Sequence, residues 1–387
     1  GRDPTMRIDT LRWSAPDQRW DGPRTDPAPQ LVLHFGPTDV LAEGGPYRAL
    51  HARFPHAAIV GCSAGSQILG DDVDDDATVA AVLHFDRARV RANATSLSDA
   101  ADSFEAGVRL ATPLMSYDLA GVLVLSDGLG VNGTRLVAGI TATLGERVPL
   151  SGGLAGDGPR FARTVVGLDE VPATGRVVLV GLYGASLRFS HAAVGGWDAF
   201  GPPRRITRST DSVLHELDGR PALDLYERYL GEEAAGLPGT ALLYPLRIWD
   251  PARPAEAVVR TVLAVDRDAR TMTFAGDVPE GWTAQLMRGS HEHLVRGAER
   301  AAADADARCE VVGDGARLAL LVSCVGRRLL MGQRTADEVE AVGDALGART
   351  VRVGFYSYGE IAGRDVDTRC DLHNQTMTVT LIDEAVA

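Results

Sequence analysis

The spacing of apolar and polar residues predicts three copies of one structural unit. In each copy, a short apolar strand is followed by a helical stretch, a second strand and a glycine-rich turn. Two of the helical stretches end in "LG", with apolar residues at helical spacing and the glycine where a C-cap belongs. A further β-rich run follows each copy. The copies occupy residues 31–70, 121–158 and 318–363.

The glycine turns of the first and third copies align without gaps. The matching pairs include Val60 with Val353, Gly61 with Gly354, and Ile68 with Ile361. Gln67 falls opposite Glu360 in the same alignment. Matching residues in matching strand–turn contexts indicate a duplicated building block.

The pattern between the second and third copies changes. Residues 160–287 are mostly short alternating or apolar runs between Gly, Pro and Asp turns, which is typical of β-strands. Helices are predicted over 220–231, with Pro near the start and Gly at the end, and over 290–308. The whole pattern predicts an α+β (mixed α/β) protein with two sheet domains and helices packed outside.

The composition of the chain limits which kinds of partner and which cellular compartment we expect. The chain has 387 residues and a formal net charge of −13, which argues against nucleic acid or an anionic membrane as the main partner. Its four cysteines are widely spread, so we expect no disulfide framework and no structural zinc site, as in a reducing cytoplasm. No apolar run is long enough to cross a bilayer. The residues "GRDPT" before Met6 are typical of a cloning remnant.

One short motif raises an enzymatic alternative. Residues 61–65 read G-x-S-x-G, the pattern of a nucleophile elbow, so Ser63 or the neighbouring Cys62 could be a nucleophile with a histidine as base. A nucleophile elbow leads directly into a helix, however, and here an acidic loop and a β-branched run follow. In the duplicated unit Ser63 falls opposite Tyr356, so the unit itself requires no hydroxyl nucleophile at that position.

Two further glycine-rich turns allow more than one interpretation. The stretch "GLGVNG" (128–133) matches a dinucleotide-binding pattern, but the next strand lacks the required acid, and Asn132 could simply cap a helix. The stretch "SGGLAGDG" (151–158), which contains Asp157, could bring backbone N–H groups close to a ligand or could form a tight turn.

The C-terminal part of the chain has the densest group of candidate binding residues. In "FYSYGEIAG" (355–363), Tyr356 and Tyr358 share one face of an extended backbone, and Glu360 beside them could pair with a ligand amine. In "LHNQTM" (372–377), His373 and Asn374 offer donors, acceptors and a possible metal ligand.

These stretches together resemble one known family. The motifs "IVGCSAGSQI", "VPLSGGLAGD" and "GGWDAFGPPRRITRS", and above all "VGFYSYGEIAG…LHNQTMTVTL", are similar to those of the FIST family, the F-box and intracellular signal transduction proteins. The resemblance covers nearly all of residues 30–385. It departs in the first glycine loop, where Gln67 replaces the family's glutamate. The resemblance implies a remnant and N-terminal segment over 1–29, a FIST N-terminal domain over 30–218 and a FIST C-terminal domain over 219–387.

The resemblance also implies a function. The family is regarded as an intracellular sensory module that binds small ligands such as amino acids, with a signalling protein such as a histidine kinase as a possible partner, and it is not known as an enzyme family. Some members are haem proteins that sense nitric oxide, which makes haem a possible cofactor here, with His373 or His191 as its ligand. We expect a ligand site at the glycine turns near the domain junction. The expected site residues are Tyr356, Tyr358, Glu360, His373 and Asn374, with Cys62, Ser63 and Asp157 as second choices.

Overall fold

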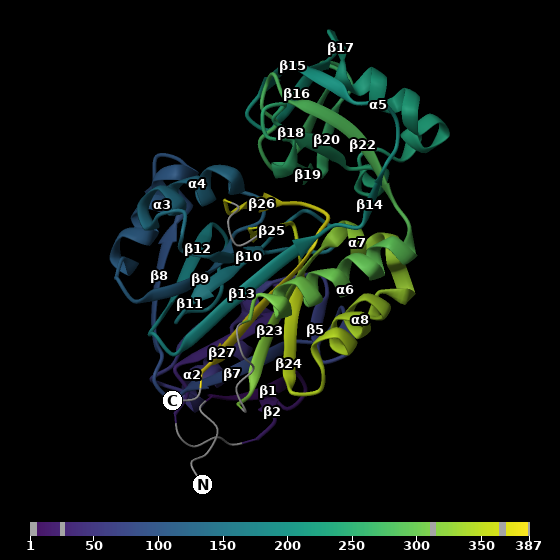
Figure 1. The fold of residues 1–387 in the computed structure, drawn as a ribbon. Coiled ribbons are helices and arrows are strands. Elements are labelled where there is room, and N and C mark those ends of the chain that lie inside the picture. The colour runs from purple at the N-terminus through teal and green to yellow at the C-terminus, as the bar shows by residue number, and fades with distance from the viewer. Residues whose placement is uncertain (1–5, 24–27, 310–314, 364–368, 386–387) are drawn as a thin grey trace.

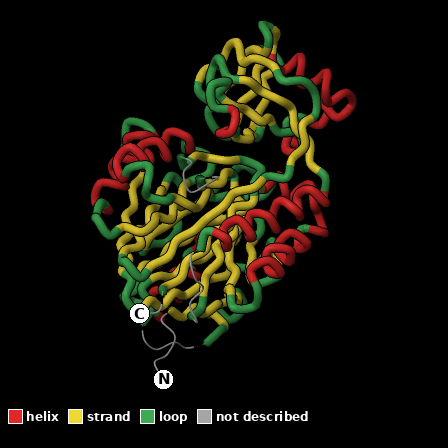
Figure 2. The backbone as a smooth tube through the Cα atoms, in the orientation of Figure 1, coloured by secondary structure: helices red, strands yellow, loops and turns green. Residues whose placement is uncertain are grey.

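A computed structural model describes residues 6–23, 28–309, 315–363 and 369–385. Within these ranges the chain forms eight α-helices and 27 strands in four sheets, which confirms the α+β class (Figure 1). Three of the sheets form a body, and the fourth forms a separate lobe above it (Figure 2). The predicted cloning remnant at residues 1–5 lies outside the described residues.

The three sheets of the body have six strands each. The first contains β11 (Val166–Leu168), β4 (Ala58–Ser63), β3 (Leu31–Gly36), β7 (Val79–Phe85), β1 (Met6–Ser14) and β2 (Arg19–Asp21). The second contains β26 (Asp371–His373), β25 (Gly359–Ala362), β10 (Leu150–Leu154), β9 (Leu119–Ser126), β12 (Arg176–Tyr183) and β8 (Arg89–Ser96). The third contains β13 (Leu187–Val194), β27 (Met377–Glu384), β23 (Arg317–Cys324), β24 (Thr350–Ser357), β5 (Gln67–Leu69) and β6 (Asp72–Asp74).

The predicted repeat is confirmed, one unit to each sheet. A parallel pair joined by helix forms the centre of each body sheet: β3 with β4, β9 with β10, and β23 with β24. The β-rich run that follows each unit adds an antiparallel strand on the other side: β7, β12 and β27. Because β1 belongs to the first of these sheets, the N-terminal segment is part of the first unit.

The short strands that follow the glycine turns are exchanged between the sheets. The turn after β4 sends β5 into the third sheet, where it pairs with β24. The turn after β24 sends β25 into the second sheet, against β10, and the chain beyond β10 sends β11 into the first sheet, against β4. This cyclic exchange ties the three sheets together around the glycine turns, so the turns lie inside the body.

Glycine is required where these strands come close to one another. A Cβ at Gly354 on β24 would lie 1.8 Å from the carbonyl oxygen of Leu321 on β23. At the aligned position Gly61, a Cβ would lie 2.2 Å from the imidazole ring of His34. The aligned glycines of the repeat therefore serve close packing between neighbouring strands.

One apolar core joins the inner faces of the three sheets, and helices cover their outer faces. The core includes Leu33, Leu125 and Leu320, one from each sheet. Outside, α1 (Thr38–Glu43) and α2 (Gly45–Arg53) accompany the first sheet, α3 (Ser103–Ala111) and α4 (Gly133–Leu144) the second, and α6 (His291–Ala307), α7 (Val325–Met331) and α8 (Ala336–Leu346) the third. The predicted helix C-caps are confirmed at Gly145 and Gly347.

The lobe comprises residues 197–289 and has its own core. Its strands are β14 (Trp197–Ala199), β15 (Arg204–Thr210), β16 (Val213–Leu217), β17 (Arg220–Pro221), β18 (Leu246–Trp249), β19 (Val258–Arg260), β20 (Val262–Asp266), β21 (Thr271–Phe274) and β22 (Thr283–Gly289), and α5 (Ala222–Leu230) packs against them. The first and last strands of the sheet path, β19 and β20, are separated only by Thr261. The sheet is therefore strongly curled, so that its two edge strands lie next to each other in the sequence.

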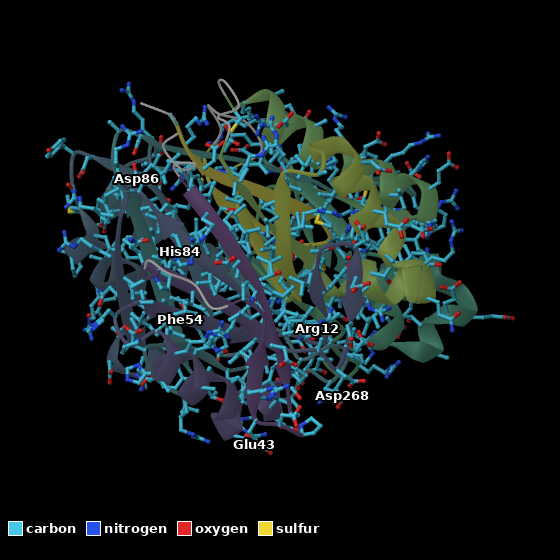
Figure 3. The ribbon with its side chains drawn as sticks, turned by 90° about the horizontal axis from the view of Figure 1, so that it is seen from below. Arg12, Glu43, Phe54, His84, Asp86 and Asp268 are labelled. Atoms are coloured by element: carbon cyan, nitrogen blue, oxygen red, sulfur yellow. The ribbon has the colours of Figure 1, made fainter. Side chains whose placement is uncertain are left out.

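The acidic stretch 71–76 has arginine partners around it. Arg12 on β1 lies 3.4 Å from the carboxylate of Asp72, and Arg328 on α7 lies 3.2 Å from that of Asp75. Arg12 projects from the face of the body seen in Figure 3. The stretch is thus an exposed ion-pair surface that edges the third sheet.

The strand exchange predicts how fragments of the chain fold. A fragment of residues 30–218 lacks β25 and the strands β23, β24 and β27 at the centre of the third sheet, so we expect it not to unfold cooperatively. A fragment of residues 197–289 keeps its own core, and we expect a cooperative melt by circular dichroism. Cooperative unfolding of the first fragment alone would contradict the exchange.

Candidate functional site

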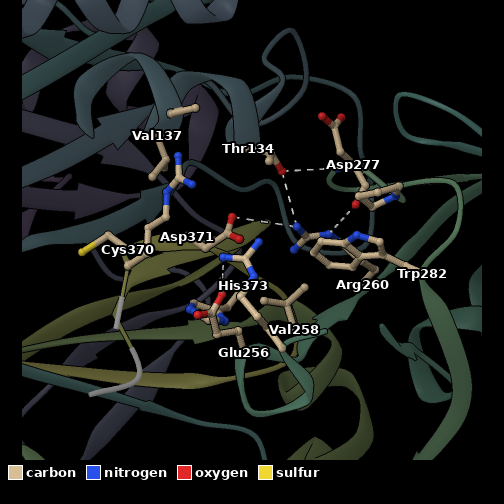
Figure 4. A pocket seen from close by; sticks show the side chains of 14 residues that line it. Thr134, Val137, Glu256, Val258, Arg260, Asp277, Trp282, Cys370, Asp371 and His373 are labelled. Atoms are coloured by element: carbon tan, nitrogen blue, oxygen red, sulfur yellow. Dashed lines mark hydrogen bonds and ion pairs between the residues drawn. The ribbon is translucent and has the colours of Figure 1, made fainter. Parts of the chain in front are cut away.

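A cavity of about 240 Å³ lies where the lobe meets the body (Figure 4). Helix α4 and strand β26 supply the body side, and β19 with the loop around Asp277 supplies the lobe side. The lining residues are Thr134, Val137, Ala138, Arg253, Glu256, Val258, Arg260, Asp277, Pro279, Trp282, Arg369, Cys370, Asp371 and His373.

Arg260 is the most unusual of these residues because its charged side chain is 2% exposed. Its guanidinium donates to the carbonyl oxygens of Asp277 (3.0 Å) and Leu372 (2.5 Å), and to Thr134 Oγ1 at 3.4 Å. Its acidic neighbour Asp371 is 3.9 Å away, beyond hydrogen-bond distance. Burial lowers the pKa of Arg260, because a cation with mainly neutral partners is costly to keep from water.

Carboxylates stand on both sides of the same cavity. Asp277 on the lobe accepts a hydrogen bond from Asn132 Nδ2 (2.7 Å), the residue that caps α4. Asp371 on β26 accepts from the backbone N–H of Leu372, and burial raises the pKa of Asp371. The ring of Trp282 and the side chains of Val137 and Val258 add apolar surface.

This lining suits a small molecule that carries both charges. An arginine fork matches a carboxylate with two parallel hydrogen bonds, and an aspartate can accept from an ammonium group. The volume is below the range of about 300–1,000 Å³ that is usual for drug-sized ligands. The cavity therefore fits a ligand of metabolite size.

The segment 372–375 fastens the lobe to the body, and Asn374 is its central residue. The backbone N–H of Asn374 donates to the carbonyl oxygen of Val259 (3.0 Å), and Asn374 Oδ1 accepts from the N–H of Thr261 (3.0 Å). Thr261 is the residue between β19 and β20, where the ladder is interrupted and an amide needs another partner. Gln375 Nε2 donates to the carbonyl oxygen of Leu242 in the lobe (2.7 Å). We call Asn374 and Gln375 the clasp.

Tyr356 belongs to a buried ion-pair network in the third sheet. Its hydroxyl donates to Glu338 on α8 (2.6 Å), which also accepts from Ser323 (2.9 Å) and pairs with Arg327 on α7 (2.8 Å). Arg327 and Glu338 are both 0% exposed. Burial and the neighbouring carboxylate raise the pKa of Tyr356, so its hydroxyl remains a donor.

Glu360 on β25 is also fully buried. It accepts from the N–H (2.7 Å) and hydroxyl (2.9 Å) of Thr376 and from the hydroxyl of Ser357 (2.9 Å). Burial raises its pKa to about 8 in spite of these hydrogen bonds. Glu360 is therefore mostly protonated at neutral pH.

Of the residues predicted from the sequence to bind a ligand, His373 lines the cavity. Its Nε2 donates to the carbonyl oxygen of Ala362 (2.8 Å). Tyr358 lies in the second sheet's outer core, donates to the carbonyl oxygen of Gly158 (2.8 Å) and stacks on Phe161. Asp157 is buried and accepts from the N–H of Arg163 (3.2 Å). The structure thus distributes the predicted residues over several sheets, and their role in ligand binding stays a prediction.

Cys62 and Ser63 lie at the end of β4 with no exposed surface. Ser63 Oγ donates to the carbonyl oxygen of Gly156 (3.0 Å) and accepts from the N–H of Val165 (2.9 Å). Burial raises the pKa of the Cys62 thiol, which disfavours the reactive thiolate. The chain continues from this turn into β5, a strand, so the geometry of a nucleophile elbow is absent at this turn.

Neighbouring side chains also occupy backbone N–H groups of the dinucleotide-like stretch 128–133. Asp127 Oδ1 accepts from the N–H groups of Leu129 and Gly130, each at 2.7 Å. Asn132 accepts from the N–H of Arg135 and caps α4, as the alternative interpretation predicted. These amides are therefore engaged and do not form a phosphate cradle.

The two histidines considered as haem ligands do not fit that role. His191 Nε2 accepts from the N–H of Gly363 (3.0 Å), and His373 Nε2 makes the hydrogen bond to Ala362. Burial lowers the pKa of His191 to about 4, so it is neutral, but its accepting nitrogen is already used. Within the described ranges, no three His, Cys, Asp or Glu side chains converge as metal ligands.

Comparison with known proteins identifies the family. The FIST N domain model matches residues 30–220, and the FIST C domain model matches residues 222–363. The chain belongs to the FIST family. FIST domains are associated with sensing in signal transduction and with small-ligand binding. The boundary between the two matches falls inside the lobe, so the cavity is lined by residues of both FIST matches and of β26 beyond them.

Other comparisons with this FIST protein add little. No curated protein matches it. Among solved structures, cyanuric acid hydrolase from A. caulinodans is similar with 9% identity and a TM-score of 0.36, over 99% of this chain and 100% of that one. We base no inference on a similarity at this level. Among the described helices, none combines the length and apolar character of a membrane span.

Sequence reasoning missed Arg260, Asp277, Trp282 and Asp371 as cavity residues. One signal was present, because Arg260 is the single charged residue in the apolar run "AVVRTVLAV" (257–265). An arginine inside a buried strand needs a partner or a ligand. The other residues come from turns whose positions only the fold brings together.

Neutralising the two buried glutamates, Glu360 and Glu338, should change the stability of the protein in different ways. Glu360 stays protonated in the folded chain up to a pKa of about 8, whereas an unfolded glutamate ionises near 4.5. The contribution of Glu360 to the free energy of unfolding therefore falls as pH rises from about 4.5 to about 8, by up to about 1.4 kcal/mol per pH unit. Glu360→Gln should remove this contribution, so the variant should gain stability relative to the wild type as denaturant unfolding is followed from pH 5 to pH 8.

Glu338→Gln is the matched control. It leaves Arg327 buried without its counter-charge and should cost about 3–5 kcal/mol throughout that range. An unchanged dependence of stability on pH in Glu360→Gln would contradict the assignment of the protonated group.

Ser63→Ala should lower stability without a chemical phenotype. The substitution leaves the N–H of Val165 without its acceptor and should cost about 1–3 kcal/mol. Serine- and cysteine-directed probes should label residues 62 and 63 of the native protein no faster than background, as mass spectrometry would show. Rapid labelling at either residue would revive the hydrolase alternative.

Proposed function

We propose that this FIST protein is a sensory module that binds a small zwitterionic ligand, such as an amino acid, in the cavity between lobe and body. The observation that carries the proposal is Arg260, a buried guanidinium at the cavity wall whose hydrogen-bond partners among the described residues are neutral oxygens. A ligand carboxylate would add hydrogen bonds and a closer negative charge than Asp371, which lies 3.9 Å away.

The rest of the lining supports a ligand with a positive group as well. Asp277 and Asp371 stand on opposite walls, from the lobe and from β26. Each carboxylate has oxygen lone pairs beyond those used by Asn132 and by the N–H of Leu372. Trp282 offers an apolar or aromatic surface for a side chain.

The haem alternative has less support. Neither His191 nor His373 has its Nε2 available, and six charged side chains line the cavity. The absorption spectrum of protein from haem-supplemented cells tests this alternative, and we expect no Soret band that depends on either histidine.

The binding experiment is a thermal-shift screen of the standard L-amino acids, followed by calorimetry of each hit. A ligand at 100 times its dissociation constant stabilises the folded chain by about 2.7 kcal/mol. Arg260→Gln should weaken binding of a hit by at least about tenfold, because a hydrogen bond to a charged group contributes about 1.5–3 kcal/mol.

Arg204→Gln serves as the control for this experiment. Arg204 pairs with Asp218 within the lobe, away from the cavity, so affinity should not change. Equal affinity in the wild type and Arg260→Gln would contradict the site.

A further inference from the structure

We propose, on the basis of the function proposed above, that the lobe is a hinged unit and that ligand binding changes its orientation relative to the body. The lobe would close on α4 and β26 when a ligand joins Arg260 to the cavity walls. Three features of the molecule support a hinge: the narrow connection of the lobe, its polar junction with the body and the anchored base of the connection.

The connection is a narrow ribbon. The chain enters the lobe through Gly195 and Gly196 and leaves it after Gly289, and Trp197 on β14 pairs directly with Gly289 on β22. Gly196 has a φ of 82°, in the left-handed region that favours glycine. A two-stranded ribbon flanked by glycines can absorb a change of backbone angle that a packed domain boundary would resist.

The two sides of the junction do not share an apolar core. The residues of the lobe core all lie between 200 and 286, whereas the body cores contain none of them. Hydrogen bonds and ion pairs cross the junction. The clasp bonds to Val259, Thr261 and Leu242, Arg260 bonds to Leu372 and Thr134, and Asn132 bonds to Asp277. His293 on α6 also pairs with Asp198 on β14 at 2.5 Å, and Arg260 lies 3.9 Å from Asp371. Domains joined through small polar interfaces move relative to one another by default.

The base of the ribbon is anchored firmly to the body. Arg327 donates to the carbonyl oxygens of Gly195 and, at 2.7 Å, of Leu294 on α6, while its charge is balanced by Glu338. Trp197 Nε1 donates to the carbonyl oxygen of Gln375 (2.6 Å). The pivot is thus fixed at one end by a buried ion pair, and the lobe beyond it is held by hydrogen bonds and by the exposed pair of Asp198 with His293.

Arg260 belongs both to the proposed ligand site and to the contacts that hold the lobe against the body. It is a lobe residue, yet two of its hydrogen bonds reach Thr134 on α4 and Leu372 on β26 in the body. A carboxylate bound to the Arg260 guanidinium would either replace those two hydrogen bonds or use the N–H groups that they leave over. The N–H groups of Arg260 would thus bind the ligand and also hold the lobe in position. A ligand would therefore interact differently with the two orientations of the lobe, as a two-state change requires.

Electron–electron distance measurements test the hinge. Spin labels are placed at Asp268→Cys on the lobe and Glu299→Cys on α6, both exposed, in a Cys309→Ser background. The probe is an equimolar mixture of the twenty standard L-amino acids. We expect Asn374→Ala to broaden the unliganded distance distribution, and the mixture to narrow or shift that of the wild type.

The controls separate the hinge from the binding site. Arg204→Gln, inside the lobe, should leave the distribution unchanged, and Arg260→Gln offers a second junction variant if Asn374→Ala does not fold. Unchanged distributions in the junction variants would overturn the hinge. A thermal shift from the mixture without a distance change would overturn the coupling but leave the proposed function standing. If the mixture gives no thermal shift, the proposed function fails and the junction variants alone decide the hinge.

Discussion

The exchange of short strands between the three body sheets constrains the rest of the molecule. β5, β11 and β25 each leave the unit in which they begin and complete the sheet of another. The glycine turns after β4, β10 and β24 pass between sheets and are largely buried, and many of their polar groups are satisfied internally. Ser63 between Gly156 and Val165 is one example. A body built in this way has its glycine turns at its centre, and the cavity forms at its rim, where the lobe is attached.

Buried charge is used differently at the two ends of the lobe's attachment. At the pivot, Arg327 has a full counter-charge in Glu338, and removing either partner would leave an isolated buried ion. At the cavity, Arg260 has carbonyl and hydroxyl oxygens as hydrogen-bond partners and a carboxylate, that of Asp371, at 3.9 Å. The first arrangement is a fixed structural anchor. The second leaves binding capacity for an anion, at a position that joins both halves of the junction.

The sequence was sufficient to predict the repeat, since each unit is a local pattern of strand, helix, strand and glycine turn. It also predicted the α+β class, helices over 220–231 and 290–308, the two helical stretches that end in "LG" and correspond to α4 and α8, and a cap at Asn132 as one of two interpretations. It did not predict that the turns would be exchanged between sheets, because that depends on contacts between residues hundreds of positions apart, such as Phe355 with Gln67.

The candidate site was harder to predict for the same reason. A motif such as "LHNQT" contains residue types that bind ligands, but its asparagine and glutamine are used to hold the lobe. Glu360 similarly satisfies Thr376 and Ser357 in the interior. The cavity residues come instead from α4, from the lobe and from the chain at β26, and all except His373 stand in stretches without a recognisable motif. Only His373 belongs both to a motif and to the cavity wall.

A crystal structure of the protein grown with the mixture of twenty L-amino acids tests the central claim most directly. The account predicts electron density between Arg260 and Asp277, with a ligand carboxylate in hydrogen-bond contact with the guanidinium and an ammonium group facing Asp277 or Asp371. Density at the glycine turns inside the body, or a saturated crystal whose cavity contains only water, would contradict it.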